Sequence, residues 1–290
     1  MFLSSLSLNP IYMAPSAWWQ HVPIAHWLVA ELKPPRIVEL GTHYGVSFFS
    51  FCEAAQAFSP DTFVYAVDTW EGDEHASFYE GNVFNKVENH WERAHRLRAR
   101  LVRSKFDDAT KYFEDKSIDI LHIDGLHTYE AVKHDYQTWL PKMKSEHVIL
   151  FHDINVRERD FGVWKLWEEL KDANTTYEVP NGHGLGILIN GEDTRRSFAD
   201  FAALVKALQS KGELLEKIAN LTPGGSFSAN PVEQARAEAE QARAEAEQTR
   251  AEAQKSQQEL ASMRDSGFWK ISSPARKLLD RIRTRHFEGP

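Results

Sequence analysis

The sequence lacks the features that mark exported and membrane-spanning proteins. Cys52 is the only cysteine among 290 residues, which excludes an intramolecular disulfide and a thiolate zinc cage. The first lysine or arginine is Lys33, so no basic segment precedes an apolar one near the N-terminus. No apolar run approaches the ~18 residues that a transmembrane helix needs. We therefore expect a cytoplasmic protein that is neither exported nor membrane-spanning.

Positive charge is scarce outside the C-terminal end. The net charge is −8, but residues 265–290 hold six Lys or Arg against three acidic residues, which leaves −11 for residues 1–264. Such a main body should repel nucleic acid and anionic membranes, whereas the C-terminal end should not. We predict no nucleic-acid partner.

Apolar residues are abundant enough for one α/β domain, because 42% of the chain is hydrophobic. Short apolar runs alternate with helix-length segments, which predicts a parallel sheet wrapped by helices. Two later runs separated by "NGHG" predict an antiparallel hairpin, and a helix at roughly 194–212 should close the domain. The seven predicted strands are 36–40, 63–68, 99–104, 118–124, 147–153, 175–180 and 184–190.

Beyond this predicted domain, residues 1–215, the chain changes character. A Pro/Gly/Ser-rich linker is predicted over 216–232, followed at 233–264 by a seven-residue repeat that begins "EQARAEA". Its hydrophobic seam is mostly alanine, which buries little area. The helix is thus either an oligomeric coiled coil or partner-binding rod, or a solvated single helix that acts as a spacer.

The last segment, residues 265–290, predicts a basic amphipathic helix. Ala275, Leu278, Leu279 and Ile282 share one helical face, and basic residues occupy the rest. We expect this tail to dock the chain reversibly on an anionic inner-membrane surface. The stretch "DSGFWKISSPARKLLDRIRTRHF" also resembles the segment that follows coiled coils in some bacterial glycan-assembly enzymes, which implies a membrane-bound glycan-assembly partner as the other docking site. The alternative is a helix that packs against the acidic main body.

Two of the predicted strands end in residues that suit a nucleoside cofactor. In "VELGTHYGVS", Gly41 and Gly45 allow a tight turn at a helix N-terminus. The dinucleotide fingerprint needs a second glycine two residues after the first, and this position is His43, which disfavours NAD. Asp68, at the end of the next strand, can accept hydrogen bonds from ribose hydroxyls.

These motifs together resemble the class I S-adenosylmethionine-dependent methyltransferase family over about residues 15–212. The stretches "DTWEGDEHASFYEGNVF", "HIDGLHTYEAVKHDYQTWL" and "VILFHD" resemble more narrowly a bacterial branch of small-molecule and sugar O-methyltransferases, some of them metal-dependent. The resemblance implies a Rossmann-like α/β fold with a mostly parallel seven-stranded sheet, a C-terminal hairpin and here a helical coiled-coil extension. It also implies S-adenosylmethionine as the cofactor, with contacts from Glu39, Gly41, Thr42, Gly45, Ser47, Asp68, Trp70, Ser104, Phe106 and Asp124.

Metal and proton chemistry are expected at the ends of the fourth and fifth strands. Asp124 and Asp153 end strands that are neighbours in this fold, so both carboxylates can bind one Mg²⁺ or Mn²⁺ ion, with His152 beside them. His127 is the expected general base, and a helix-capping role is its alternative. His134 is expected at the surface and Asp135 as a structural acid.

Two further segments have less specific patterns. "GDEHASFY" supplies Asp73, His75 and Tyr79, expected to contact the substrate on a loop over the same edge of the sheet. The Trp- and His-rich "SAWWQHVPIAHWL" indicates a packed amphipathic helix or a lid.

We therefore expect an O-methyltransferase that acts on a hydroxyl of a small molecule or of a sugar or glycan intermediate. Two other classes stay open at this point. One is a non-catalytic Rossmann-like scaffold of a glycan-assembly complex, which the four acids Glu39, Asp68, Asp124 and Asp153 argue against. The other is an NAD-dependent sugar oxidoreductase, which His43 argues against.

Overall fold

The computed structural model describes residues 2–73, 77–78, 83–158 and 160–222. The predicted heptad helix and basic tail lie outside these residues. Among the described residues, no helix combines the length and the apolar character needed to cross a bilayer.

A seven-stranded sheet forms the centre of the domain, in the order β5-β2-β1-β6-β7-β9-β8. The first five strands run parallel and the last two pair antiparallel, as predicted. The central strands are buried over most of their length, because helices cover both faces of the sheet. The strands are β1 (Arg36–Leu40), β2 (Phe63–Asp68), β5 (Ala99–Arg103), β6 (Ile118–Ile123), β7 (Met143–His152), β8 (Thr175–Val179) and β9 (Leu185–Asn190).

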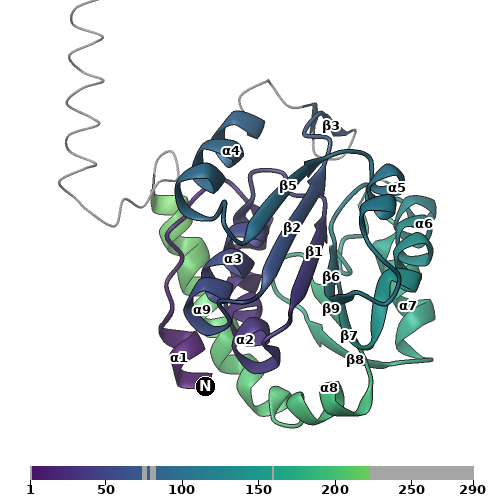
Figure 1. Cartoon of the computed structure of the whole chain (residues 1–290). Coiled ribbons are helices and arrows are strands. Elements are labelled where there is room, and N and C mark those ends of the chain that lie inside the picture. The colour runs from purple at the N-terminus through teal and green to yellow at the C-terminus, as the bar shows by residue number, and fades with distance from the viewer. Residues whose placement is uncertain (1, 74–76, 79–82, 159, 223–290) are drawn as a thin grey trace, which may run out of the picture. The chain divides into compact units, whose positions relative to one another are not determined.

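Helices lie on both faces of this sheet (Figure 1). One layer contains α1 (Phe2–Ser7), α2 (Val22–Leu32), α3 (Val46–Phe58), α4 (Val83–Ala94) and α9 (Phe201–Leu221). The other contains α5 (Phe106–Ala109), α6 (Tyr129–Trp139) and α7 (Val163–Lys171), while α8 (Glu192–Ser197) follows β9. Short 3-10 turns complete the set at Ala17–His21 (η1), Thr110–Tyr112 (η2) and Leu140–Lys142 (η3).

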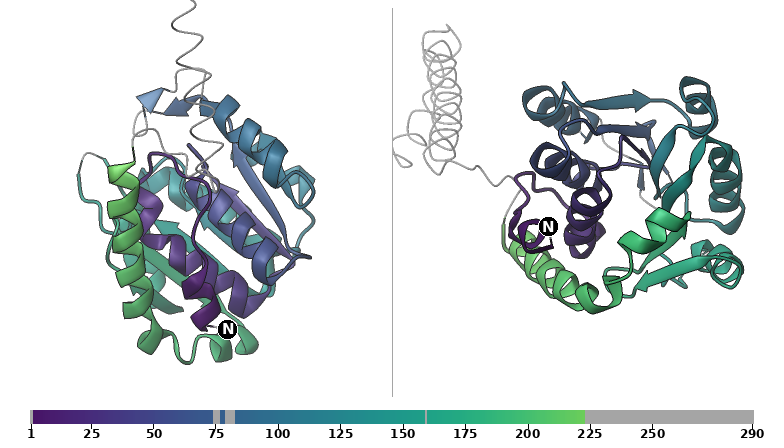
Figure 2. Two further views of the ribbon diagram at one scale, coloured as in Figure 1. Left: turned by 90° about the vertical axis from the view of Figure 1, so that its left-hand side faces the viewer. Right: turned by 60° about the horizontal axis from the view of Figure 1, so that its bottom comes forward.

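The N-terminal segment packs against the last helix, although about 190 residues separate them in sequence. Figure 2 shows α9 running beside the N-terminal helices. The approach is close: a Cβ added at Gly212 would lie 2.1 Å from the carbonyl oxygen of Gln20, so only glycine fits there. Trp19 and Trp27 are buried in the core of this layer, as the packed-helix interpretation predicts.

The fold class and the strand positions are confirmed, with four differences in the elements. The single helix predicted at roughly 194–212 is two helices, α8 and α9, with a turn between Ser197 and Phe201. β7 begins four residues before the predicted strand, at Met143. α9 continues to Leu221, so residues 216–221, which we expected in the linker, are helical. A two-stranded hairpin that was not predicted, β3 (Gly72–Asp73) with β4 (Ser77–Phe78), follows β2.

Candidate active site

A cavity of about 360 Å³ opens at the carboxyl ends of the parallel strands, where ligands bind in open α/β sheets. It is lined by the turns that follow β1, β2, β6 and β7, by α5 and by η1. Its lining residues are Ser16, Ala17, Trp18, Gly41, Thr42, His43, Ser47, Asp68, Thr69, Gly72, Lys105, Phe106, Asp124, Gly125, Leu126, His127, His152 and Asp153.

The turn after β1 requires glycine at its first position. Gly41 has a φ of +85°, and a Cβ there would lie 2.0 Å from the carbonyl oxygen of Asp124. Gly45, with a φ of +86°, is the N-cap of α3. Gly41 therefore lets the turns after β1 and β6 meet at the floor of the cavity.

Asp68 organises this turn through its carboxylate. Its Oδ2 accepts hydrogen bonds from the backbone N–H groups of Thr42 (2.7 Å) and His43 (3.1 Å), and its Oδ1 accepts one from Trp70 (2.7 Å). A carboxylate oxygen offers about two acceptor sites, so Oδ1 keeps one for a ligand while both sites of Oδ2 are used. The main role of Asp68 is thus to hold the turn after β1 against the turn after β2.

Glu39 lies behind the cavity wall rather than in it. Its side chain is fully buried, and its Oε2 lies 2.9 Å from Nδ1 of His122. The Nε2 atom of His122 faces the indole N–H of Trp18 at 3.2 Å. Because an indole nitrogen can only donate, Nε2 must accept and the ring proton sits on Nδ1, where it is donated to Glu39. This chain orients Trp18 at the cavity wall.

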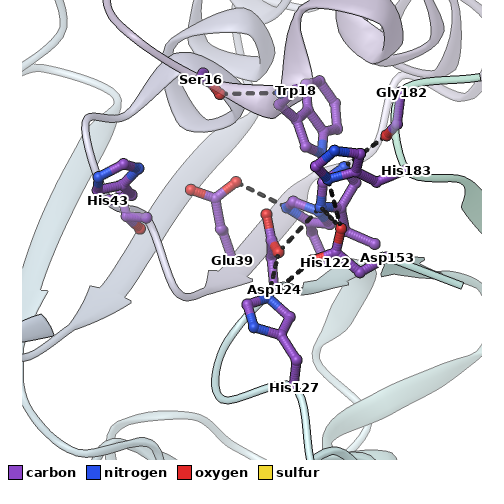
Figure 3. A network of polar contacts seen from close by, with 12 residues as sticks. Ser16, Trp18, Glu39, His43, His122, Asp124, His127, Asp153, Gly182 and His183 are labelled. Carbon is purple, nitrogen blue, oxygen red and sulfur yellow. Dashed lines mark hydrogen bonds and ion pairs between the residues drawn. The ribbon is translucent and has the colours of Figure 1, made fainter. Parts of the chain in front are cut away.

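Two aspartates and a histidine meet at the ends of β6 and β7. One ligand atom from each of Asp124, His152 and Asp153 lies within 4.8 Å of the others, close enough to hold one metal ion. Figure 3 shows Asp124 and Asp153 beside His127 and His183. His152 Nδ1 is 3.2 Å from Asp124 Oδ1 and 3.5 Å from Asp153 Oδ1. Asp153 has a φ of +63°, a left-handed conformation that aspartate tolerates and that is frequent at functional sites.

The orientation of the His152 ring is set by the carbonyl group of Gly182. Its Nε2 lies 3.2 Å from the carbonyl oxygen of Gly182, which can only accept a hydrogen bond. Nε2 therefore donates, and Nδ1 faces the two aspartates. A carbonyl behind a histidine is the usual arrangement of a metal-ligating imidazole.

His127 stands between the two aspartates. Its Nε2 is 3.0 Å from Asp153 Oδ2 and 3.4 Å from Asp124 Oδ1, and its ring stacks on Phe161 at 4.7 Å with an interplanar angle of 5°. The helix-capping alternative does not hold, because Thr128 is the N-cap of α6 and its side chain accepts from Ala131 N.

The charges at this centre stabilise one another. Burial lowers the pKa of His127, but hydrogen bonds to Asp124 and Asp153 outweigh it and raise the pKa to about 9. Burial alone would raise the pKa of Asp124 and Asp153, but the attraction of His152 and His127 outweighs it. The pKa values of both aspartates are therefore well below their usual range. As described, His127 is therefore protonated at neutral pH and cannot accept a proton until negative charge beside it is neutralised.

The structure brings together most of the predicted site residues. Those that line the cavity are Gly41, Thr42, Ser47, Asp68, Phe106, Asp124, His127, His152 and Asp153. Four others do not line it, namely Glu39, Gly45, Ser104 and Trp70. The hydroxyl of Ser104 donates to the carbonyl oxygen of Lys105, and the indole N–H of Trp70 donates to the carbonyl oxygen of His43. Of the three substrate residues, Asp73 lies in β3 without a described side chain, and His75 and Tyr79 lie outside the described residues.

Two helix residues are where the sequence predicted. His134 is exposed and faces Asp107 at 2.8 Å, which confirms a surface position. Asp135 is buried on α6 and does not line the cavity, in agreement with a structural acid.

Two residues of the site, Trp18 and His183, were not predicted from the sequence. Trp18 reaches the cavity from η1, although its segment was interpreted mainly as a packed helix. His183 approaches the aspartates from the β8–β9 turn, with Nδ1 3.1 Å from Asp153 Oδ1. Its position in the "NGHG" turn beside the last parallel strand was the one signal for it.

Comparison with known proteins gives the class of this domain. Residues 38–154 match the family profile described as a methyltransferase domain. The chain is also 46% identical over 187 residues to the uncharacterised protein y4gI of Sinorhizobium fredii, a stretch that is 64% of this chain and 20% of that protein. The chain thus spans about a fifth of the length of this relative.

Several solved structures are also similar. A putative caffeoyl-CoA O-methyltransferase of Staphylococcus aureus has 17% identity and a TM-score of 0.47 over 59% of this chain and 82% of that one. SAH-bound PaMTH1 of Podospora anserina has 13% identity and a TM-score of 0.47 over 62% and 90%. TomG of Streptomyces achromogenes has 16% identity and a TM-score of 0.43 over 66% and 86%.

The family match bears out the predicted methyltransferase class: residues 38–154 are similar to a methyltransferase domain. The matched segment begins in β1 and ends just past β7, so it contains the turns after β1, β2 and β6 and the start of the turn after β7, all of which line the cavity. Neither the scaffold nor the NAD-dependent class gains support from these matches.

Proposed function

We propose that this protein transfers the methyl group of S-adenosylmethionine to a hydroxyl oxygen of an acceptor, at a site that holds a divalent cation. The observation that carries the proposal is the convergence of Asp124, His127, His152 and Asp153 in the lining of the cavity that the glycine turn also borders. The acceptor's hydroxyl would meet the cofactor's methyl group beside these four side chains.

The cavity fits such a cofactor. Its volume of about 360 Å³ lies within the range of small-molecule sites, and Phe106 and Leu126 give it apolar wall. The hydroxyl of Thr42 is buried without a hydrogen-bond partner among the described residues, as expected of a group that awaits a ligand. Asp68 would accept one ribose hydroxyl through Oδ1, while its other contacts hold the loop in place.

The chain's own residues would align and deprotonate the acceptor. The hydroxyl gives its proton to Nε2 of His127, the oxygen forms a bond to the methyl carbon, and the carbon–sulfur bond breaks, leaving a neutral thioether. Phe161 stacks on the His127 ring and fixes its plane for that transfer. Trp18, oriented by His122, closes the wall on the N-terminal side.

The donor set bears on the identity of the metal. Asp124 and Asp153 offer carboxylate oxygens and His152 offers Nδ1, a mixture that suits manganese, iron(II) or zinc better than magnesium. A cation held there would polarise the acceptor hydroxyl and neutralise the aspartates that now raise the pKa of His127.

The acceptor class rests on the sequence resemblance, and the partners rest on the heptad repeat and the basic tail of the sequence. We propose a sugar or glycan intermediate as the first acceptor class to test, ahead of other small hydroxyl compounds. The heptad helix would assemble copies of the chain, and the basic tail would dock on an anionic membrane surface or glycan-assembly partner. Sedimentation with anionic vesicles, comparing the full chain with one that ends at Met263, tests the tail.

Calorimetry tests the cofactor directly. The full chain should bind S-adenosylmethionine and its demethylated product, and Asp68→Ala should weaken both by about tenfold or more, since the loop and the ribose contact are lost together. Asp61→Ala is the control, because Asp61 is an exposed carboxylate that pairs with Arg98. Binding of NAD in preference to S-adenosylmethionine would overturn the proposal.

Turnover tests the metal and the acceptor. Methyl transfer to a panel of sugars and small hydroxyl compounds should stop after exhaustive chelation and return with manganese, iron(II), zinc or magnesium. Asp153→Asn should abolish that recovery, whereas Asp115→Asn, an exposed carboxylate paired with Lys142, should leave it intact. Full activity of the chelated protein would remove the metal from the mechanism.

A further inference from the structure

A second group of metal-ligand side chains lies outside the cavity described above. Glu53 comes from α3, His90 from α4, and His95 from the turn between α4 and β5. One ligand atom from each lies within 4.8 Å of the others. None of the three lines the candidate active site, and the methyl-transfer chemistry does not use them.

Glu53 is held in place by the N-terminal segment. Ile11 N donates to both carboxylate oxygens at 3.1 Å, and Tyr12 N donates to Oε1 at 3.0 Å. A carboxylate has about four acceptor sites, so Oε2 retains one for a cation. Backbone donors behind a carboxylate are the kind of outer support that fixes a metal ligand.

The two histidines are fixed by aromatic packing. Phe49 meets the His90 ring edge-on at 4.6 Å and stacks on the His95 ring at 5.5 Å, and the two imidazoles are 5.4 Å apart. Nε2 of His90 is buried and has no hydrogen-bond partner among the described residues. A buried polar atom without a partner is rare enough to require an explanation.

The three side chains approach one another without direct bonds among the described residues. Within the described residues, no hydrogen bond or ion pair joins Glu53 to either ring, and the buried carboxylate lacks a cation partner.

We propose that Glu53, His90 and His95 form a transition-metal site whose natural ion is zinc(II). Two imidazole nitrogens and one carboxylate oxygen are a zinc donor set, whereas magnesium and calcium prefer oxygen alone. His95 also lines a neighbouring cavity of about 180 Å³. This site is independent of the proposed methyl transfer.

The ion would join three parts of the fold. It links α3 to the end of α4 directly, and Glu53 extends the link to Ile11 and Tyr12. The Tyr12 hydroxyl then donates to Tyr44 O at 2.6 Å, next to the glycine turn of the cavity. The site is thus structural, and the metal should stabilise the layer that supports the cofactor turn.

Zinc stoichiometry is the direct test. The full chain is stripped with a chelator and titrated with zinc(II), and the bound zinc is counted by mass spectrometry. His90→Gln and His95→Gln should each bind one zinc fewer per chain than the wild type. His134→Gln, an exposed histidine on α6, should match the wild type. Asp153→Asn separates the two groups, because it should still bind the zinc that His90→Gln loses.

Thermal denaturation and X-ray absorption provide two further tests of the zinc site. Zinc should raise the Tm of the stripped Asp153→Asn variant, in which the first site is disabled, but not that of the double variant Asp153→Asn/His90→Gln. If the histidine variants fail to fold, X-ray absorption of zinc-loaded Asp153→Asn should show two imidazoles in the zinc shell. Equal zinc content in the wild type and a folded His90→Gln, or a zinc shell without imidazole in Asp153→Asn, would overturn the site.

Discussion

The imidazole of His127 lies 3.0 Å from Asp153 and stacks face to face on Phe161, so one ring is held both by charge and by packing. In the chelated protein we expect the His127 ring to titrate at about pH 9, because the hydrogen bonds to Asp124 and Asp153 outweigh its burial. Proton-detected NMR titration of the full chain measures this pKa.

Asp153→Asn should lower that pKa towards the ordinary value near 6.5, since one of the two charges that stabilise the imidazolium is lost. Asp107→Asn is the matched control: it removes the partner of His134 and should leave His127 unchanged. A His127 pKa that ignores Asp153→Asn would mean that the two side chains do not meet in solution.

A second expectation concerns the two glycines of the turn after β1. Both have φ near +86°, so alanine at either costs about 1–2 kcal/mol of backbone strain. At Gly41 the added Cβ would lie 2.0 Å from a backbone oxygen, whereas at Gly45 it would lie 2.8 Å from the Phe49 ring, which can shift. Urea denaturation should therefore show a larger loss of stability for Gly41→Ala than for Gly45→Ala. Equal losses would contradict the close approach of the two turns.

Much of the fold could be predicted because its pattern is local. β1 and β2 coincide with apolar runs in the sequence, and alternation with helices implies a parallel sheet. Once the sheet is parallel, Asp124 and Asp153 must end at one edge, and the pairing of β6 with β7 confirms it. The approach of His152 to both aspartates follows from the same geometry.

What could not be predicted depends on contacts distant in sequence. Glu39 was assigned to the cofactor by resemblance, but it bonds His122, whose partner Trp18 is 104 residues away. Asp68 was expected to hold the ribose, yet three backbone N–H groups of nearby turns use most of its acceptor sites. Except for the bond from Trp70 to Asp68, which is local, these contacts arise only when β1, β2, β6 and η1 pack together, so no spacing rule indicates them.

The tautomer of His122 provides a third test. The indole N–H of Trp18 can only donate, so we expect the His122 proton on Nδ1 and a lone pair on Nε2. Nitrogen-15 NMR of the ring distinguishes the two tautomers. Trp18→Phe should change the Nε2 shift by removing its donor, whereas Trp19→Phe should not, because Trp19 donates to Ala14 O instead. A proton found on Nε2 would contradict the chain from Glu39 to Trp18.

The acid sensitivity of the fold should depend on His26, which is fully buried in α2. Burial, with a smaller contribution from Lys211, lowers its pKa from 6.5 to about 3. Below pH 6.5 the unfolded chain therefore binds a proton at His26, whereas the folded chain binds it only below about pH 3. The free energy of unfolding is thus unaffected by His26 above pH 6.5 and decreases as the pH falls below 6.5. By linkage this one residue costs about 2 kcal/mol at pH 5.

His26→Phe removes the proton acceptor and keeps an apolar ring, so any packing change it introduces is independent of pH. The difference in unfolding free energy between His26→Phe and the wild type should thus shift in favour of the variant by about 2 kcal/mol between pH 7.5 and pH 5. Urea denaturation at the two pH values measures that shift. His134→Phe, at an exposed position where the ring is paired with Asp107, should not gain stability on acidification. Parallel pH profiles of His26→Phe and the wild type would mean that His26 titrates in the folded protein as it does in the unfolded one.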